Sequence, residues 1–267
     1  MVAGGDRSTD RAVNSCEVFD PKTHRWQDAP AMLARRFGHA AVSLSNGDIV
    51  VVGGHSGHEP HNSLERWEIK TGVWRSIAGK LSGPSMLPAA VRVDTGNVLI
   101  AGGLQGDRKG STALHLYNPM TDAVTRPSVN LGSPRWGAMI TSLPDGRVLI
   151  VGGYCNCLVR GDDVFDPLRG TITTIGHPGV PPQTARLLTL VDGRALLVGG
   201  LHNTSKVDPR QTLAFSALRG GTWSNVASLN MPRWNHTATL MRDGSVVVIG
   251  GKASSRQYSN TAELLFP

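Results

Sequence analysis

Five basic side chains recur at two fixed distances before a pair of adjacent glycines. Arg36, Arg135 and Arg233 each lie seventeen residues before such a pair, and His39 and His236 lie fourteen residues before it. A guanidinium presents five donors in a rigid fork that matches a carboxylate, and an imidazole changes charge near neutral pH. These five residues are therefore predicted to bind an anionic ligand. The alternative is that they are structural and hydrogen-bond neighbouring turns of the repeat.

A histidine-rich loop and a pair of cysteines carry the residue types that bind metals. His55, His58 and His61 lie close together, and one residue separates Cys155 from Cys157. Imidazole and thiolate are common ligands of zinc and copper. Neither spacing matches a standard site, so a solvated polar loop is the preferred interpretation, and no metal or other cofactor is predicted. The two cysteines are also expected to be too close in sequence to pair with each other.

The glycine pairs mark an internal repeat of about fifty residues. The steps between the first glycines of successive pairs are 49, 49, 50, 47 and 51 residues. An apolar run precedes each of the last five pairs, which predicts a strand covered on both faces. Glycine is predicted to be structural here because it lets two backbones approach without a Cβ. After Gly4 and Gly5, the pairs are Gly53 and Gly54, Gly102 and Gly103, Gly152 and Gly153, Gly199 and Gly200, and Gly250 and Gly251.

Each repeat carries signals for four antiparallel strands. Asn46 followed by glycine, and its Asp-Gly equivalents, predict a tight hairpin between the first and second strands. A third strand ends in a turn at Asp20 and at equivalent positions, and Trp26, Trp74 and Trp223 mark a fourth strand. The predicted fold class is therefore all-β.

This pattern resembles the kelch repeat, in the bacterial form seen best between Arg233 and Gly244. The resemblance covers nearly the whole chain and implies a β-propeller similar to the propeller domain of galactose oxidase-like proteins. About six blades of four antiparallel strands are expected, with incomplete first and last blades. A single domain is predicted over 1–267, with repeat units at roughly 1–30, 31–80, 81–129, 130–177, 178–229 and 230–267.

The first and last repeats overlap instead of complementing each other. Residues 1–30 supply the end of a second strand plus strands three and four, whereas residues 233–267 supply strands one to three. We therefore expect that an N-terminal segment is missing. The alternative is a five-bladed ring in which residues 23–29 complete the last blade and residues 1–20 form an extra flap. No secretory signal is visible before the first strand, and the location stays open, because a missing N-terminal segment would leave a secreted or surface location possible.

In a propeller the first strand of each blade is innermost, which places the five basic residues at the mouth of the central channel. In the kelch adaptors that this chain resembles, the loops after the second strands open on the same face and hold acidic peptide segments. Loops on a rigid scaffold are where binding usually occurs. The corresponding loops here include His55 to His61, Leu104 to Ser111, Tyr154 to Val159 and Leu201 to Thr212.

Two enzyme classes with similar propellers supply the alternative function, a carbohydrate-active enzyme. Copper radical oxidases similar to galactose oxidase need two tyrosines, two histidines and a cysteine cross-linked to one tyrosine. The tyrosines here are Tyr117, Tyr154 and Tyr258, and Tyr117 occupies a structural position of the repeat. A kelch-type sialic acid epimerase would need a base at the channel mouth, for which His39 and His236 are the candidates. Their recurrence favours a structural role, so no catalytic residue is predicted.

Composition narrows the classes of partner. The chain has 267 residues, 40% of them hydrophobic and 18% charged, so it can bury a core. No apolar run approaches the roughly 18 residues that a membrane span needs. The net charge of +7 favours acidic partners, but it is scattered, which argues against nucleic acid. The predicted function is a non-catalytic scaffold that binds an acidic protein segment or a glycan.

Overall fold

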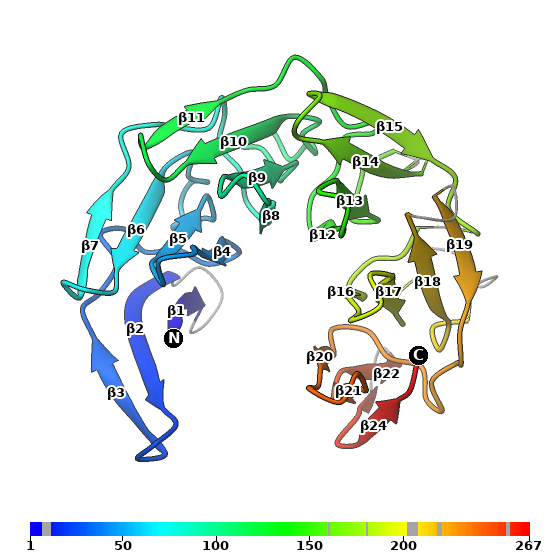
Figure 1. Ribbon diagram of the computed structural model, residues 1–267. Coiled ribbons are helices and arrows are strands. Elements are labelled where there is room, and N and C mark those ends of the chain that lie inside the picture. The colour runs from blue at the N-terminus through cyan, green and yellow to red at the C-terminus, as the bar shows by residue number, and fades with distance from the viewer. Residues whose placement is uncertain are drawn as a thin grey trace. The chain divides into compact units, whose positions relative to one another are not determined.

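The computed structural model describes residues 1–6, 12–157, 159, 161–179, 181–201, 208–217, 221–254 and 257–267. Within these residues the secondary structure consists of β-strands, with no helix (Figure 1). The chain is an all-β propeller of six blades, most of which have four antiparallel strands. The predicted fold class is therefore confirmed.

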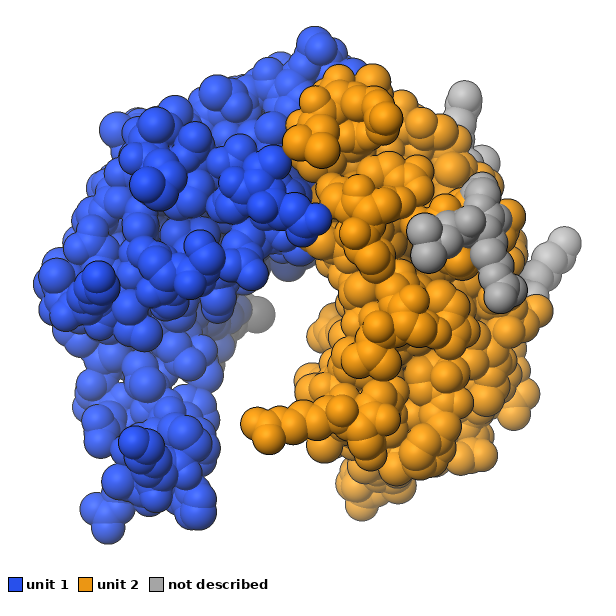
Figure 2. Space-filling model, in the orientation of Figure 1, with its two compact units in different colours: residues 1–130, 134–136 blue, residues 131–133, 137–267 orange. Residues whose placement is uncertain are grey.

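The blades fall into two compact units (Figure 2). Unit 1 comprises residues 1–130 and 134–136 and contains blades 1 to 3. Blade 1 is a sheet of β1 (Val2–Asp6), β2 (Ala12–Asp20) and β3 (Arg25–Ala29). Blade 2 consists of β4 (Ala40–Ser43), β5 (Ile49–Val52), β6 (Leu64–Glu68) and β7 (Val73–Ser76). Blade 3 consists of β8 (Ala89–Arg92), β9 (Val98–Ala101), β10 (Leu114–Asn118) and β11 (Ala123–Thr125).

Unit 2 comprises residues 131–133 and 137–267 and contains blades 4 to 6. Blade 4 consists of β12 (Met139–Ser142), β13 (Val148–Val151), β14 (Asp162–Asp166) and β15 (Thr171–Ile175). Blade 5 consists of β16 (Arg186–Thr189), β17 (Ala195–Val198), β18 (Thr212–Ser216) and β19 (Thr222–Asn225). Blade 6 consists of β20 (Thr237–Leu240), β21 (Val246–Ile249) and β24 (Ala262–Leu265), and β22 (Lys252–Ser254) pairs with β23 (Gln257–Tyr258) beside it.

The five-bladed alternative is wrong, because the fourth strand of the first repeat stays in its own sheet. Strand β3 pairs with β2 in antiparallel register, with Phe19 opposite Trp26 and Cys16 opposite Ala29. Residues 23–29 therefore belong to blade 1 and do not complete blade 6. Strand β1 belongs to the same blade, because it pairs with β2.

The predicted hairpins and apolar strands are confirmed. Gly47 has a φ of 88°, and its amide donates a hydrogen bond of 3.1 Å to the carbonyl of Leu44, which closes the turn between β4 and β5. Three of the second strands are buried along their whole length, with all four residues of β9, β13 and β17 buried. Burial on both faces explains why these strands are continuous apolar runs.

Glycine pairs connect successive blades. The amide of Gly54 donates to the carbonyl of Ser85 at 2.8 Å, and the amide of Gly200 donates to that of Arg233 at 2.8 Å. At Gly102, where φ is 66°, a Cβ would lie 2.5 Å from the Arg135 carbonyl oxygen. Any other residue would therefore push the backbone at Gly102 away from Arg135.

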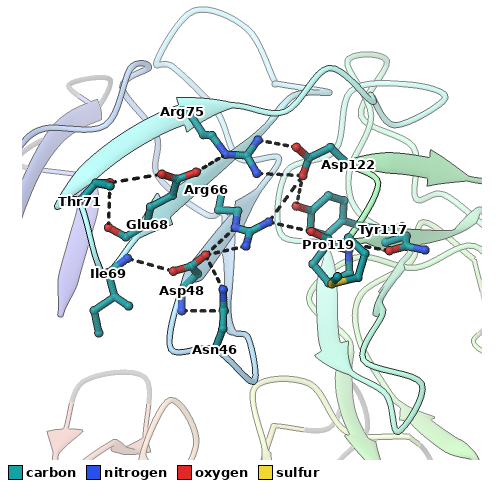
Figure 3. Close-up of polar contacts among 12 residues, drawn as sticks. Asn46, Asp48, Arg66, Glu68, Ile69, Thr71, Arg75, Tyr117, Pro119 and Asp122 are labelled. Carbon is teal, nitrogen blue, oxygen red and sulfur yellow. Dashed lines mark hydrogen bonds and ion pairs between the residues drawn. The ribbon is translucent and has the colours of Figure 1, made fainter.

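A charged network joins blades 2 and 3 within unit 1 (Figure 3). Arg66 donates to Asp48 at 2.8 Å and to the carbonyl of Pro119 at 2.8 Å. Arg75 bonds Asp122 through both terminal nitrogens, at 2.5 and 3.1 Å. The buried Tyr117 hydroxyl donates to the same Asp122 carboxylate at 2.7 Å. Burial, followed by the nearby Asp122 charge, raises the pKa of Tyr117 to about 12.

Replacing Tyr117 with phenylalanine is expected to lower the free energy of unfolding by about 1 kcal/mol, because Asp122 loses one donor while the ring remains. The midpoint of thermal unfolding should fall by about 2 to 4 °C, which calorimetry can measure. The control is Tyr258→Phe, because the Tyr258 ring is exposed to solvent. Trp67→Phe in the neighbouring blade would not serve as a control, because it also changes packing. Equal changes in both variants would contradict the role given to the hydroxyl.

Candidate binding site at the loop face

In four blades the segment that leads into the first strand pairs with the loop that follows the second strand. Isolated bridges join these two segments, and we call the surface formed by the bridged residues the loop face. In unit 1 it consists of Phe37, His55, Met86 and Leu104, and in unit 2 of Gln183, Leu201, Trp234 and Lys252. Seven of these eight side chains are half-buried, with Gln183 fully buried, so they combine a fixed position with accessibility.

A left-handed backbone corner follows the loop-face residue before each first strand. The φ angles are 59° at Gly38, 53° at Leu87, 62° at Gly137, 54° at Thr184 and 55° at Asn235. For leucine and threonine this conformation costs about 1 to 2 kcal/mol, so the surrounding structure must enforce it. Strained backbone of this kind is often found at functional sites.

Hydrogen bonds between successive corners help to hold the backbone in this conformation. The amide of Leu87 donates to the carbonyl of Gly38 at 2.6 Å in unit 1. In unit 2 the amide of Asn235 donates to the carbonyl of Thr184 at 3.1 Å. The corners therefore hold the loop-face side chains in register from one blade to the next.

Arg36, the first of the predicted anion-binding residues, is buried within blade 2. Its side chain is 1% exposed and donates to Glu65 from Nε at 3.0 Å and from Nη2 at 2.8 Å. Its other donors reach the carbonyl of Gly53 at 2.7 Å and the carbonyl and hydroxyl of Ser63 at 3.2 and 2.7 Å. Glu65 also accepts the amides of Leu33 and Ala34. The pair thus fixes the segment that leads into the first strand.

Arg233 repeats this arrangement in blade 6. Its side chain is 0% exposed, and its Nε donates to Glu263 at 2.9 Å. The terminal nitrogens reach the carbonyl of Gly250, the Ser259 hydroxyl and both oxygens of Thr261. Arg135 is also 0% exposed.

The guanidinium groups of Arg36 and Arg233 are buried and hydrogen-bonded inside their blades, so they are not exposed to solvent. Their contact with an anionic group, and that of Arg135, stays a prediction. The sequence holds a signal for the structural role: an acidic residue recurs on the third strand in those three repeats, as Glu65, Asp163 and Glu263. In the repeat with Ser85, that position is His115.

His39 and His236 occupy an equivalent position beside the glycine pairs. A Cβ on Gly54 would lie 2.9 Å from that of His39, and one on Gly251 would lie 2.8 Å from that of His236. Burial lowers the pKa of both imidazoles, to about 4 for His236, where the charges of Arg186 and Arg233 act in the same direction. His236 is 0% exposed, so its neutral ring cannot reach a substrate without a structural change. Binding by these two residues stays a prediction.

Arg186, which the sequence pattern did not single out, begins β16 close to His236. The residue is exposed, and its Nη1 donates a hydrogen bond to the carbonyl of Ala185 at 3.3 Å. Within the described part of the chain, no carboxylate pairs with it. Partial desolvation lowers the pKa of its guanidinium. This arginine is therefore available to an anionic ligand, unlike Arg36 and Arg233.

Thr184 and Tyr154 lie beside each other in unit 2, at the corner that precedes Arg186. Thr184 stands two residues before it at the left-handed corner, and its hydroxyl lowers the pKa of the Tyr154 phenol against the larger raising effect of burial. We call Tyr154, Thr184 and Arg186 the unit 2 cluster. The sequence held a signal for Arg186, because the residues at the equivalent positions of other repeats are uncharged: Ala40, Ala89, Met139 and Thr237. Only this repeat places a charge there.

The histidine-rich loop is held by its own hydrogen bonds. The His55 ring accepts the amide of Gly57 at 2.9 Å, and His61 Nε2 lies 3.1 Å from the carbonyl of Arg35. Burial lowers the pKa of His61. Among the residues that the structure describes, no group of three or more His, Cys, Asp or Glu side chains is placed to hold a metal ion. Residues 158 and 202–207 of the predicted loops lie outside the described residues.

The expectation for the two cysteines was wrong: Cys155 and Cys157 form a disulfide, with their Cα atoms 4.9 Å apart. One intervening residue, Asn156, is enough because the backbone turns back at this loop. The amide of Cys157 also donates to Cys155 Sγ at 3.0 Å. The third cysteine, Cys16, is a buried free thiol in blade 1.

Comparison with known proteins identifies Kelch motifs in the chain. A family model described as the Kelch motif matches residues 1–33 and 35–80, and the same four-stranded unit continues through the other blades. The chain is a kelch-repeat β-propeller. Human Kelch-like protein 33 is 31% identical to this kelch propeller over 170 residues, which cover 57% of it and 31% of the human protein.

Two further relatives are similar in the same way. Kelch repeat-containing protein kel-10 of Caenorhabditis elegans is 31% identical over 179 residues, which cover 63% of the kelch propeller and 30% of kel-10. Kelch-like protein 7 of Rattus norvegicus is 31% identical over 74 residues, covering 28% and 12% of the two chains. The kelch propeller therefore spans less than a third of the length of these relatives.

Solved structures share the fold. A fungal alcohol oxidase of the AA5 family, in complex with copper, superposes with a TM-score of 0.80 at 18% identity, covering 99% of this kelch propeller and 60% of the oxidase. The structure of YjhT gives a TM-score of 0.71 at 12% identity, covering 98% and 93% of the two chains. At these identities the similarity concerns the fold alone.

The described residues do not fit the copper radical site that the oxidase resemblance implies. Tyr117 is buried and donates its hydroxyl to Asp122, and the free thiol of Cys16 contacts the carbonyl of Asn14. A cysteine cross-linked to a tyrosine is not present in this part of the chain. No step through copper is assigned. No helix among the described residues is long and apolar enough to cross a membrane.

Proposed function

We propose that this kelch propeller is a non-catalytic scaffold that binds an acidic segment of a partner protein at the unit 2 cluster and the adjoining loop face. The observation that carries the proposal is Arg186, an exposed arginine without a carboxylate partner among the described residues. It follows two residues after the rigid corner at Thr184, whose side chain lies beside the Tyr154 phenol. A guanidinium recognises a carboxylate through charge-assisted hydrogen bonds.

Apolar contacts near this cluster support binding of a polypeptide rather than of a small ion. The half-buried Trp234 lies on the loop face of the next blade, and Lys252 places its ammonium 4.9 Å from the centre of the exposed Tyr258 ring. Tryptophan, tyrosine and arginine are the residues that most often dominate binding energy at protein interfaces. The net charge of +7 adds long-range attraction for an acidic partner.

The test compares two arginines on one hairpin. Arg186→Ala removes the charge of the unit 2 cluster, whereas Arg194→Ala removes an arginine at the β16–β17 turn that is paired with Asp192 at 2.6 Å. Affinity for a glutamate-rich peptide, measured by fluorescence polarisation, should fall about tenfold or more in the first variant. It should change about twofold or less in the second. Affinity should also fall as salt is raised.

Three outcomes would argue against the proposal. Equal effects of the two substitutions, or affinity that salt does not change, would remove Arg186 from the binding site. Binding of a neutral glycan that Arg186→Ala leaves unchanged would favour the carbohydrate alternative. Including Arg36→Ala and Arg233→Ala, with circular dichroism to confirm folding, also tests the sequence-based prediction for the buried arginines.

A further inference from the structure

The disulfide in the loop between β13 and β14 has an unusual position for a structural cross-link. It joins Cys155 to Cys157 across Asn156 alone, and both cysteines belong to the same loop. Closing so short a loop removes little conformational freedom from the unfolded chain. Strands β13 and β14 are already paired, with Val148 opposite Phe165. The cross-link is therefore not needed to hold blade 4 together.

The same disulfide is accessible to a reagent in solution. Cys157 and Asn156 are exposed, and Cys155 is half-buried. Structural disulfides resist reduction, whereas exposed ones exchange readily with external thiols. Accessibility and a small structural contribution are together typical of an exchange site.

A backbone hydrogen bond makes the two sulfurs unequal. The Cys157 amide donates to Cys155 Sγ at 3.0 Å. An N–H directed at sulfur stabilises the thiolate over the neutral thiol, and a thiol with a lower pKa is the better leaving group. The more exposed Cys157 is the easier sulfur to attack. The hydrogen bond and the exposure therefore both favour attack on Cys157 and release of Cys155.

We propose that Cys155–Cys157 is a thiol–disulfide exchange site whose substrate class is an external dithiol. One thiolate of the dithiol attacks Cys157 Sγ, the bond between the two protein sulfurs breaks, and Cys155 leaves as a thiolate. The second thiol of the reagent then attacks the sulfur joined to Cys157, which releases the Cys157 thiolate and closes the reagent's own disulfide. Two electrons pass to the protein, and the two cysteine thiolates take up two protons.

Cys16 provides an internal control for this reaction. Its side chain is 3% exposed, and burial raises the pKa of its thiol, so it should not react while the chain is folded. The exchange site and the control lie in different units. Labelling of Cys16 therefore reports unfolding, whereas labelling of Cys155 and Cys157 in its absence reports exchange.

The experiment uses the full chain purified without reductant. Samples are treated with graded dithiothreitol under native conditions, alkylated with iodoacetamide and digested, and the three cysteines are quantified by mass spectrometry. We expect no label on Cys155 or Cys157 before reduction, and label on both after mild reduction while Cys16 stays unlabelled. The midpoint of thermal unfolding should change by less than about 4 °C. Free thiols at both positions before reduction, or labelling only together with Cys16, would overturn the proposal.

Two single substitutions test the direction of cleavage. Cys157→Ser leaves the Cys155 thiol with its amide donor, and Cys155→Ser leaves the Cys157 thiol without one. The pH midpoint of alkylation should be lower for Cys155 in the first variant than for Cys157 in the second. In the wild-type chain, a glutathione adduct should form on Cys157. A higher midpoint for Cys155, or adducts mainly on Cys155, would contradict the proposed direction.

Discussion

Replacing Arg36 with methionine is expected to lower the free energy of unfolding by about 3 to 5 kcal/mol. Methionine keeps an unbranched apolar side chain but leaves the Glu65 carboxylate buried without its cation, and Glu65 is 2% exposed. The carbonyl of Gly53 also loses a donor. Chemical denaturation followed by circular dichroism measures the loss. Arg35→Met is the matched control, because Arg35 is the exposed neighbour and its replacement should cost less than about 0.5 kcal/mol.

The double variant separates charge from packing. Adding Glu65→Gln to Arg36→Met neutralises the stranded carboxylate and retains an acceptor oxygen for one of the two amides, of Leu33 and Ala34, that Glu65 accepts. The double variant should therefore be more stable than Arg36→Met alone, although each substitution by itself is destabilising. If the double variant is the less stable of the two, the buried charge is not the main cost.

Lowering the pH from 7 to 4.5 is expected to destabilise the fold through two buried histidines. Burial lowers the pKa of His236 and of His115 from 6.5 to about 4. The unfolded chain therefore binds protons that the folded chain excludes, so stability is complete above pH 6.5 and falls toward pH 4. Each histidine should contribute a loss of about 2 kcal/mol at pH 5 and about 3 kcal/mol near pH 4.

His115 has a specific reason to remain neutral. Its Nε2 accepts the amide of Ser82 at 2.9 Å, which a protonated ring could not do. Glu65 and Glu263 accept equivalent amides in other blades, so the histidine replaces a carboxylate as acceptor. His115→Gln keeps an acceptor oxygen at every pH. His236→Ala introduces the residue found at the equivalent positions, Ala138 and Ala185.

Both variants should flatten the dependence of stability on pH between 4.5 and 6.5, measured as denaturation midpoints at several pH values. Carboxylates paired in the folded state contribute mainly below that window, because their pKa values are lowered, as for Glu263 beside Arg233. A double variant that keeps the full slope would show that other groups titrate on unfolding. Recovery in only one variant would assign the effect to that histidine.

Local sequence was sufficient to predict the architecture. The glycine pairs, the Asn-Gly and Asp-Gly turns and the apolar runs act within a few residues, and their spacing gave the strands and their order in each blade. Positive φ at Gly47 and close approach at Gly102 are properties of single positions. Repetition strengthened the prediction because six copies must satisfy the same constraints.

The candidate site depended on contacts that the repeat pattern does not encode. Counting back from the glycines found Arg36 and Arg233, but their burial and their pairing with Glu65 and Glu263 depend on how the third strand crosses the blade. The same counting passed over Arg186, because its exposure is set by the strand's position and the neighbouring blade. The acidic residues that recur on the third strand were the sequence signal for the pairing of Arg36 and Arg233.

By itself, therefore, the sequence determined the kelch propeller, its blades and its turns, because these depend on backbone conformation and short-range apolar periodicity. Only the tertiary structure decided which basic groups are enclosed and which is free, and that Cys155 and Cys157 are bonded. The burial of the basic groups depends on hydrogen-bond distances of about 3 Å and on exclusion of water, and the disulfide depends on the path of its loop. Both are set by residues that lie far apart in the chain, or by how a loop turns, and neither follows from residue type and spacing.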